Sequence, residues 1–212
     1  GEIVAQVMKV QLDTKQRISH VVVMGTGEPF DNYDNVMEFV RIINHPNGLA
    51  IGARHITIST CGLIPGIQRY SDEGIQTNLA ISLHAPNDEI RNQLMPINRR
   101  YPLDDLRQAI SDYIDKTNRR VTFEYILLKD VNDSLVDARQ LAHYLRGLNA
   151  YVNLIPYNSV DEHGYQPSDQ ETIEKFKSEL LRLHINVTLR KEHGRDIDGA
   201  CGQLRAKRGR VK

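Results

Sequence analysis

The sequence has little of several features that define large classes of protein. It holds two cysteines in 212 residues, no tryptophan, and 27 basic and 27 acidic side chains. Two cysteines exclude a disulfide framework and are typical of a reducing compartment, so we expect a cytoplasmic protein. Apolar runs fall short of the roughly 18 residues that a membrane-spanning helix requires, so we expect no membrane association. The first residues form an amphipathic pattern instead of a signal peptide.

The charges are unevenly distributed along the chain. The segment from Leu189 to Lys212 carries eight basic and three acidic residues, a net charge of +5, so the rest of the chain carries −5. A basic tail on a mildly acidic body favours a partner that carries phosphates. A solvated tail without a partner explains the same charges equally well, and charge alone does not decide between the two.

Six segments have the pattern of β-strands, and helical patterns separate them. The strands are predicted at residues 18–24, 55–62, 78–84, 121–128, 151–156 and 185–190. Between them, apolar residues recur at the spacing of three and four that amphipathic helices show. This alternation predicts an α/β fold built on a parallel sheet. Periodicity alone leaves open whether the sheet is doubly wound or forms an open barrel.

The first predicted strand ends in an unusual stretch. Three consecutive valines, Val21–Val23, predict a strand that is buried on both faces, as in most parallel sheets. Gly25 and Gly27 follow, and glycine lets a ligand approach the backbone without meeting a Cβ. Glu28 then places a carboxylate at the strand end. The stretch lacks the third glycine of a dinucleotide loop, and an ordinary glycine turn explains it equally well by itself.

Polar residues also follow the carboxyl ends of other predicted strands. They are Gly27-Glu28, Ser59-Thr60, Ser82-Leu83-His84 and Tyr157-Asn158. In a parallel barrel these four points share one rim, where such folds bind their ligands. Carboxylate, hydroxyl and amide groups suit a polar small molecule that carries an ammonium group, a carboxylate and ribose hydroxyls.

Four motifs in a fixed order carry a family resemblance. They are Met24-Gly25-Thr26-Gly27-Glu28-Pro29, Ser59-Thr60-Cys61-Gly62, Ser82-Leu83-His84-Ala85-Pro86 and Asp196-Ile197-Asp198-Gly199-Ala200-Cys201-Gly202-Gln203-Leu204. Over essentially its whole length the sequence resembles the RlmN family of radical S-adenosylmethionine (SAM) methyltransferases. The Gly-Glu-Pro motif alone is weak, whereas its conjunction with the Cys201 segment is highly specific. The resemblance implies a partial, TIM-like (βα)6 barrel that holds SAM and a [4Fe-4S] cluster. It also implies methylation of carbon 2 of adenosine in 23S rRNA and tRNA.

The resemblance gives individual residues their expected roles. Gly27 and Glu28 match the segment that receives the methionyl ammonium group of SAM. Further SAM contacts match Ser59, Ser82, Leu83, His84 and Asn158. Cys201 matches the cysteine that the family methylates as an intermediate, before a radical formed from a second SAM activates that methyl group. A thiolate is the nucleophile toward a sulfonium methyl, and the small residues around Cys201 leave it accessible.

The sequence departs from the family at the cluster. The family binds iron through a Cys-x3-Cys-x2-Cys run, and this sequence has none. In the family that run, the first barrel strand and an RNA-binding domain lie upstream of the helix with which this chain begins. We therefore expect an inactive fragment: residues 1–188 form a radical SAM barrel without its first strand. Residues 189–212 then add the last strand end and a tail with the methyl-carrier cysteine and the basic cluster. We expect no metal ligands in this chain. The full-length protein would carry the cluster, use an electron donor and be monomeric.

Several alternatives stay open. A Cfr-like enzyme that methylates carbon 8 of the same rRNA adenosine shares the chemistry, although the Gly-Glu-Pro motif and the whole-chain match favour carbon 2. A cluster-free α/β module that binds RNA through its basic tail is the alternative from another class. Cys61 has the pattern of a small packed residue rather than a cluster ligand. Glu124 and Tyr125 either line the barrel interior or have a packed structural role.

Overall fold

The computed structural model describes residues 1–25, 27–158 and 164–190. Six strands form one sheet in chain order, and every neighbouring pair is parallel. They are β1 (Val21–Val23), β2 (Ile56–Thr60), β3 (Asn78–Ser82), β4 (Val121–Leu127), β5 (Ala150–Pro156) and β6 (Val187–Leu189). All six predicted strands are therefore confirmed, most of them with shorter bounds. The predicted α/β fold with a parallel sheet is confirmed as well.

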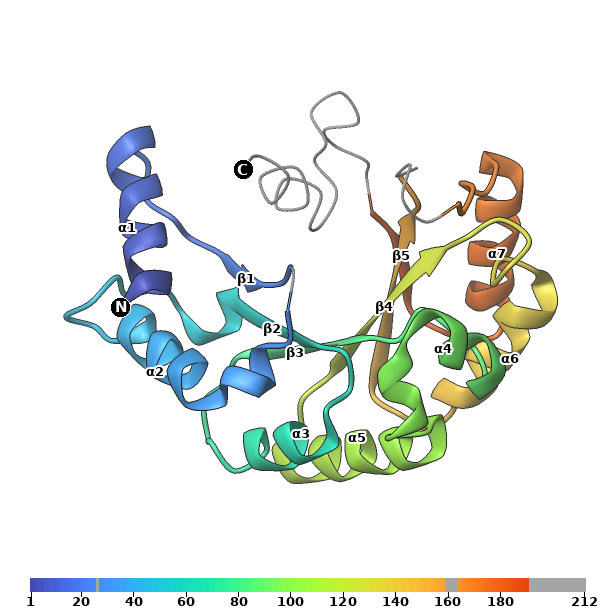
Figure 1. Cartoon of the computed structure of the whole chain (residues 1–212), viewed down its shortest axis with the longest axis horizontal. Helices are drawn as coiled ribbons and strands as arrows, with labels where there is room; N and C mark the ends of the chain where they lie inside the picture. Colours follow the sequence, from blue (N-terminus) through green and yellow to red (C-terminus); the bar gives the residue numbers. More distant parts are fainter. Residues whose placement is uncertain (26, 159–163, 191–212) are drawn as a thin grey trace.

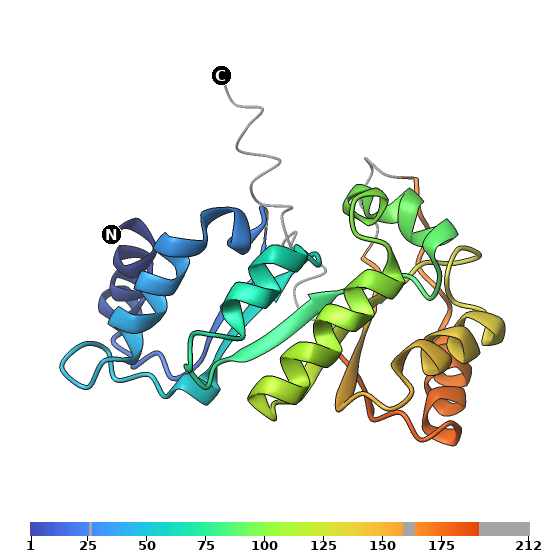
Figure 2. The ribbon, with the colours of Figure 1, turned by 90° about the horizontal axis from the view of Figure 1, so that it is seen from below.

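The described helices comprise α1 (Glu2–Thr14), which precedes β1, and those that connect successive strands. The latter are α2 (Tyr33–Asn44), α3 (Ile64–Tyr70), α4 (Asp88–Leu94), α5 (Leu103–Thr117), α6 (Leu135–Leu145) and α7 (Gln170–Arg182), with short 3-10 turns η1 (Pro29–Asn32), η2 (Ala53–His55) and η3 (Pro96–Arg99). Helices α2 to α7 lie along one side of the sheet (Figures 1 and 2). Right-handed crossovers that always step in the same direction place every helix on the same face. The sheet is thus singly wound, and it curves as an open part of a barrel (Figure 1).

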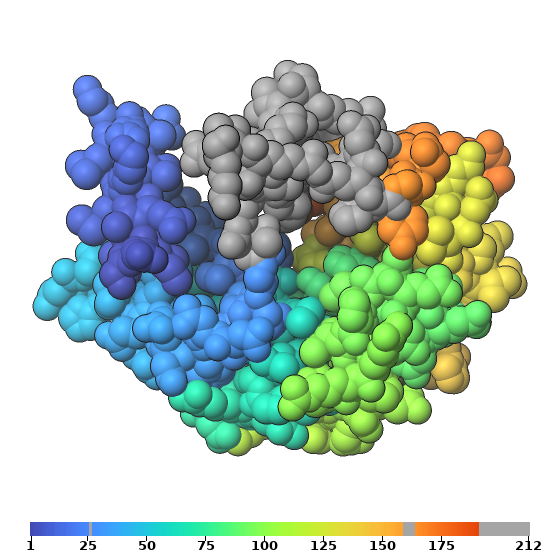
Figure 3. Space-filling view, in the orientation of Figure 1, coloured from blue at the N-terminus to red at the C-terminus, as the bar shows by residue number. Residues whose placement is uncertain are grey.

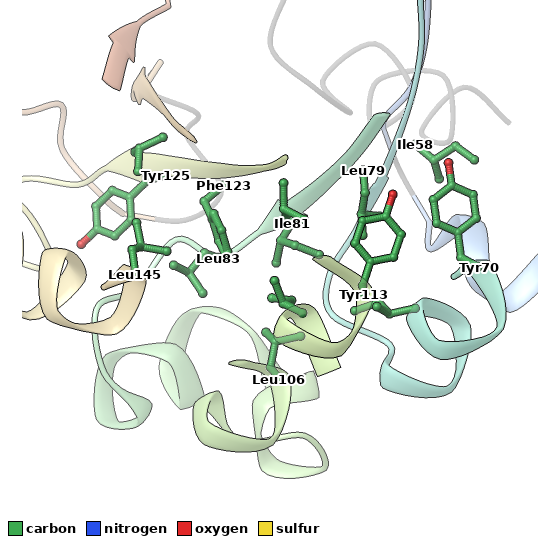
Figure 4. Close-up of a cluster of buried hydrophobic side chains, with 14 of the residues drawn as sticks. Ile58, Tyr70, Leu79, Ile81, Leu83, Leu106, Tyr113, Phe123, Tyr125 and Leu145 are labelled. Atoms are coloured by element: carbon green, nitrogen blue, oxygen red, sulfur yellow. The ribbon is translucent and has the colours of Figure 1, made fainter. Parts of the chain in front are cut away.

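The core lies between the sheet and these helices. Alternate strand residues, including Ile58, Leu79, Ile81 and Phe123, are completely buried there. Figure 4 shows them packed against Tyr70 of α3 and against Leu106 and Tyr113 of α5. Because side chains alternate along a strand, the residues between them face the concave side of the sheet. That side carries Ser59, Ser82, Glu124 and Asn153, a polar set.

The prediction that Val21–Val23 is buried on both faces is wrong. Val22 is 62% exposed, whereas Val21 and Val23 pack against the core. In the described part of the chain, β1 pairs only with β2 and lies at one edge of the sheet. An edge strand has a lateral neighbour on one side only, so the side chain on its concave face stays open to solvent.

The N-terminal and C-terminal parts of the described chain stand on opposite sides of the molecule (Figure 3).

Candidate functional site

The side chain of Glu28 links the C-terminal ends of β1 and β2 through hydrogen bonds. Glu28 Oε1 accepts a hydrogen bond from the Phe30 N–H at 3.0 Å, which caps η1. Its Oε2 accepts from the Cys61 N–H, just after β2, at 2.8 Å. A carboxylate has about four acceptor sites, so both oxygens retain a lone pair after these bonds. Glu28 therefore fixes two strand ends and can still accept from a cationic ligand.

The backbone before Glu28 is open. Gly27 adopts φ of +109°, a conformation that residues with a Cβ rarely adopt. Apart from its chain neighbours, a Cβ built on Gly27 would meet no atom of the described residues within 4 Å. Glycine is thus required here by backbone conformation and not by crowding from the described residues, which leave room for a ligand to come close to the main chain.

Polar side chains form a row across the concave face. Ser59 Oγ and Ser82 Oγ are 3.4 Å apart, and Ser82 is in register with Glu124 on β4. Asn153 Nδ2 donates to Glu124 Oε2 at 2.8 Å, and Thr188 Oγ1 donates to Asn153 Oδ1 at 3.3 Å. The row therefore runs from β2 to β6 through hydrogen bonds and strand register.

Two residues of this row, Asn153 and Thr188, escaped the sequence-based prediction. The twofold alternation with buried Val152 and Leu154 would have placed Asn153 on the concave face. The structure places Glu124 and Tyr125 on opposite faces of β4. Glu124 lies in the polar row, whereas Tyr125 lies in the core with its ring centroid 5.4 Å from that of Phe176.

Burial shapes the chemistry of Glu124. Its exposed fraction is 6%, and burial raises the pKa of its carboxyl above the ordinary value. The hydrogen bond from Asn153 and the positive charge of Arg190 act in the opposite direction. The carboxyl is consequently easier to protonate than a surface glutamate.

His84 follows β3 in a constrained position. Its φ is +59°, in the left-handed region. The Ile126 N–H donates to His84 Nδ1 at 3.2 Å, and the His84 N–H donates to the Glu124 carbonyl at 3.3 Å. Burial, with a smaller contribution from the charge of Arg91, lowers the pKa of the imidazole to about 4. The ring is therefore neutral at physiological pH.

Leu83 differs from the other candidate residues. Its side chain is completely buried and lies in the core beside the helices (Figure 4). Its N–H donates to the Glu124 carbonyl at 3.1 Å, and its carbonyl accepts from Arg91 Nε at 3.2 Å. Leu83 thus contributes to the site by fixing the main chain between Ser82 and His84.

A buried arginine supports the same strand ends. Arg91 of α4 has an exposed fraction of 0%. Its Nη2 donates to the Cys61 carbonyl at 2.7 Å, and its Nη1 donates to Asn98 Oδ1 at 2.9 Å. Burial lowers the pKa of the guanidinium. Sequence reasoning missed Arg91, because nothing in its local pattern separates it from a surface arginine.

The remaining candidate residues are Asn158 and Cys201. Asn158 follows β5 at the same edge of the parallel sheet, and the described residues show no hydrogen bond from it to another candidate. The neighbouring Tyr157 hydroxyl is buried and has no hydrogen-bond partner among the described residues. Cys201 and the basic cluster lie outside the described residues.

Comparisons with known proteins identify the family. The sequence matches the radical SAM superfamily over residues 2–142. The chain belongs to the radical SAM superfamily. Among its curated relatives, the "Probable dual-specificity RNA methyltransferase RlmN" of Spiroplasma citri is 61% identical over 210 residues, covering 98% of this chain and 60% of the relative. The protein of that name from Staphylococcus carnosus is 58% identical over 215 residues, covering all of this chain and 59% of the relative. The resemblance to RlmN that the motifs indicate is confirmed.

Solved structures agree with this assignment. A radical SAM methyltransferase from Sphaerobacter thermophilus matches with a TM-score of 0.92 and 46% identity, over 96% of this chain and 60% of that one. Streptococcus suis SuiB, solved bound to S-adenosylmethionine, matches with a TM-score of 0.65 at 12% identity and shares the fold alone. The predicted partial radical SAM barrel is therefore confirmed, whereas the absence of its first strand from this chain, which already has six strands, stays a prediction. This radical SAM chain spans about 60% of the length of the curated relatives it matches.

The superfamily implies SAM and a [4Fe-4S] cluster, and the two fit this chain differently. The acceptors at Glu28, the serine hydroxyls and the open backbone at Gly27 suit SAM. In the described ranges, no group of three or more histidine, cysteine, aspartate or glutamate residues could hold a metal ion. Cys61 is half-buried, and burial together with the nearby Glu28 carboxylate raises the pKa of its thiol to about 12, so the thiol is not readily deprotonated. The described residues therefore do not fit a cluster.

Within residues 1–25, 27–158 and 164–190, no helix is both long enough and apolar enough to cross a bilayer.

Proposed function

We propose that this radical SAM chain is the larger part of the catalytic barrel of an RNA methyltransferase. In our proposal the enzyme methylates carbon 2 of adenosine in 23S rRNA and tRNA. The observation that carries the proposal is the polar edge formed by Glu28, Ser59, Ser82 and His84, in a chain about 60% identical to relatives named RlmN. The predicted barrel (1–188) and tail (189–212) remain our division of the chain.

The residues of that edge have groups that match SAM. We propose that the main chain at Gly27 and the remaining lone pairs of Glu28 accept from the methionyl ammonium group. Hydroxyls of Ser59 and Ser82 would donate to its carboxylate or accept from its ribose. His84 adds a neutral donor, and Asn158 an amide from the next strand end. Bound SAM supplies an electrophilic methyl carbon on a sulfonium centre.

Cys201 is the proposed methyl acceptor of this chain. Its thiolate would attack the methyl carbon, forming a sulfur–carbon bond while the carbon–sulfonium bond breaks and S-adenosylhomocysteine leaves. Deprotonation is required first, because the thiolate and not the thiol is the nucleophile. This role comes from the match of Gly199 to Leu204 with the family motif.

Two cysteines cannot supply the three thiolates of the family's cluster. We therefore propose that methylation of RNA requires sequence beyond these 212 residues and that the chain alone is inactive. In the intact protein we expect the cluster, an external electron donor, a monomeric state and a cytoplasmic location.

The test is a methylation assay on the intact, cluster-containing protein with rRNA and tRNA fragments. Mass spectrometry of the digested RNA should locate the methyl group on carbon 2, and Cys201→Ala should abolish transfer while SAM binding persists. A methyl group on carbon 8 would favour the Cfr-like alternative. Full activity of Cys201→Ala would contradict the proposed acceptor. RNA binding without methylation of either carbon would favour the RNA-binding module.

A further inference from the structure

Residue 84 has a backbone conformation that is rare for a residue with a side chain. His84 has φ of +59° at the point where the chain leaves β3. Steric overlap with the Cβ disfavours this region, so such a conformation persists only where surrounding contacts determine it. The hydrogen bonds around His84 must therefore hold its backbone in this conformation.

Hydrogen bonds fix His84 from three directions. Its N–H donates to the Glu124 carbonyl at 3.3 Å, and the Ile126 N–H donates to its Nδ1 at 3.2 Å. Its carbonyl accepts from Asn132 Nδ2 at 2.8 Å. Backbone and ring are thus both tied to β4 and to the segment that follows it.

Asn132 is the one side chain among these partners, and it is itself immobilised. It is completely buried, and its Nδ2 also donates to the Ile126 carbonyl at 2.8 Å. Its side-chain Oδ1 accepts from the Leu128 N–H at 2.7 Å, and its main-chain carbonyl accepts from the Tyr125 hydroxyl at 2.7 Å. The carboxamide therefore links the end of β4 to His84 while satisfying three of its four hydrogen-bonding positions.

These contacts determine which ring nitrogen carries the proton. Nδ1 accepts from an N–H, so in the neutral ring the proton lies on Nε2. Arg91 on α4 is the charged group that acts on this imidazole, and it opposes a second proton. No described residue accepts from Nε2. His84 is held as a neutral N–H donor with its donor position unused by the described chain.

We propose that Asn132 is a positioning residue for the ligand site: through the His84 carbonyl and Ile126, it orients the imidazole so that Nε2–H can donate to an acceptor atom of the ligand. The identity of that ligand as SAM rests on the proposed function. The coupling between Asn132 and His84 does not, because it follows from the protein contacts alone.

The test begins with NMR of the intact, metal-free protein labelled with 15N at histidine. His84→Asn identifies the signals of residue 84, since asparagine tolerates the left-handed conformation. The parent should show the Nε2–H tautomer with no titration between pH 5 and pH 8. In Asn132→Asp a carboxylate would face two carbonyl oxygens, so the His84 ring should lose its single tautomer and titrate nearer to the ordinary pKa of about 6.5.

The second readout is ligand affinity in the cluster-loaded protein. Asn132→Asp should raise the KM for SAM about tenfold with a smaller change in kcat, the size expected for one misplaced hydrogen bond. Asn44→Asp is the matched control, because Asn44 Nδ2 also donates to a main-chain carbonyl, that of Ile51, at 2.8 Å. The control should lower thermal stability without changing the His84 signals or the KM. If Asn132→Asp does not fold, Asn132→Ser replaces it.

An unchanged tautomer and titration in the folded Asn132 variant would overturn the coupling. A changed His84 spectrum with unchanged SAM affinity would overturn the positioning role. If the parent binds no SAM at all while Asn132→Asp still alters the His84 spectrum, the proposed function fails and the Asn132–His84 coupling stands.

Discussion

Replacing Arg91 by methionine removes the donors that hold two strand ends. The buried guanidinium donates to the Leu83 carbonyl at 3.2 Å, the Cys61 carbonyl at 2.7 Å and Asn98 Oδ1 at 2.9 Å. A weaker contact of 3.4 Å reaches the Ser82 carbonyl. Since these carbonyls belong to the ends of β2 and β3, the loss should reach the candidate site directly.

The size of the effect follows from two opposing contributions. Each buried acceptor left without a donor costs about 1–3 kcal/mol, and the three acceptors within 3.2 Å lose their partner. Removing a buried charge relieves a desolvation penalty, which offsets part of that cost. We expect Arg91→Met to lower the free energy of unfolding by about 3 kcal/mol. Arg91→Lys keeps the charge but not the planar fork, and should lose roughly half as much.

Thermal unfolding of the intact protein, followed by circular dichroism, measures this difference. Arg107→Met is the matched control, because Arg107 also donates to two main-chain carbonyls, those of Tyr144 and Arg146, at 2.8 and 2.7 Å. Arg107 is partly exposed, so in Arg107→Met water can donate to the two carbonyls in its place. The substitution should therefore cost less than about 1 kcal/mol. Equal decreases in Tm for the two methionine variants would refute the reasoning.

Further predictions concern stability and RNA binding. Because the folded-state pKa of His84 is about 4, the unfolded chain binds the extra proton as pH falls below about 6.5. Stability should therefore decrease from pH 6.5 to pH 4, and His84→Asn should flatten that decrease in urea titrations; parallel curves would contradict it. Gly66→Ala would place a Cβ 2.6 Å from Phe30 and should destabilise by about 1–3 kcal/mol, whereas Gly52→Ala, with its nearest atom at 3.9 Å, should not. A stable Gly66→Ala protein would show that Phe30 moves freely. Removing residues 204–212 should weaken RNA binding and reduce its salt dependence, and an unchanged salt slope would exclude a role for the basic cluster.

The strands and their polar ends could be predicted from the sequence, because local patterns determine them. Runs such as Ile56–Thr60 have the composition of strands, and small polar residues end them. Parallel connectivity then places those ends on one edge. The exposure of Val22 could not be predicted, because it depends on β1 being an edge strand and not on its composition.

The supporting residues of the site could not be predicted for a similar reason. Arg91 and Asn132 are polar residues in a short helix and a loop, where the sequence pattern indicates solvent exposure. Their burial depends on contacts with main-chain carbonyls that are distant in the sequence, such as those of Cys61 and His84. Tertiary placement determines these contacts, so no local spacing reveals them.

The most direct measurement of the central claim is SAM binding by the intact, cluster-containing protein and two alanine variants. Ser82→Ala removes a hydroxyl of the concave face near the carboxyl end of β3. Thr122→Ala removes one on the same face of β4, but two residues closer to the amino end. We predict that Ser82→Ala weakens SAM binding about tenfold and that Thr122→Ala leaves it unchanged. Equal affinities for the parent and Ser82→Ala, or equal losses in both variants, would contradict a SAM site at the strand ends.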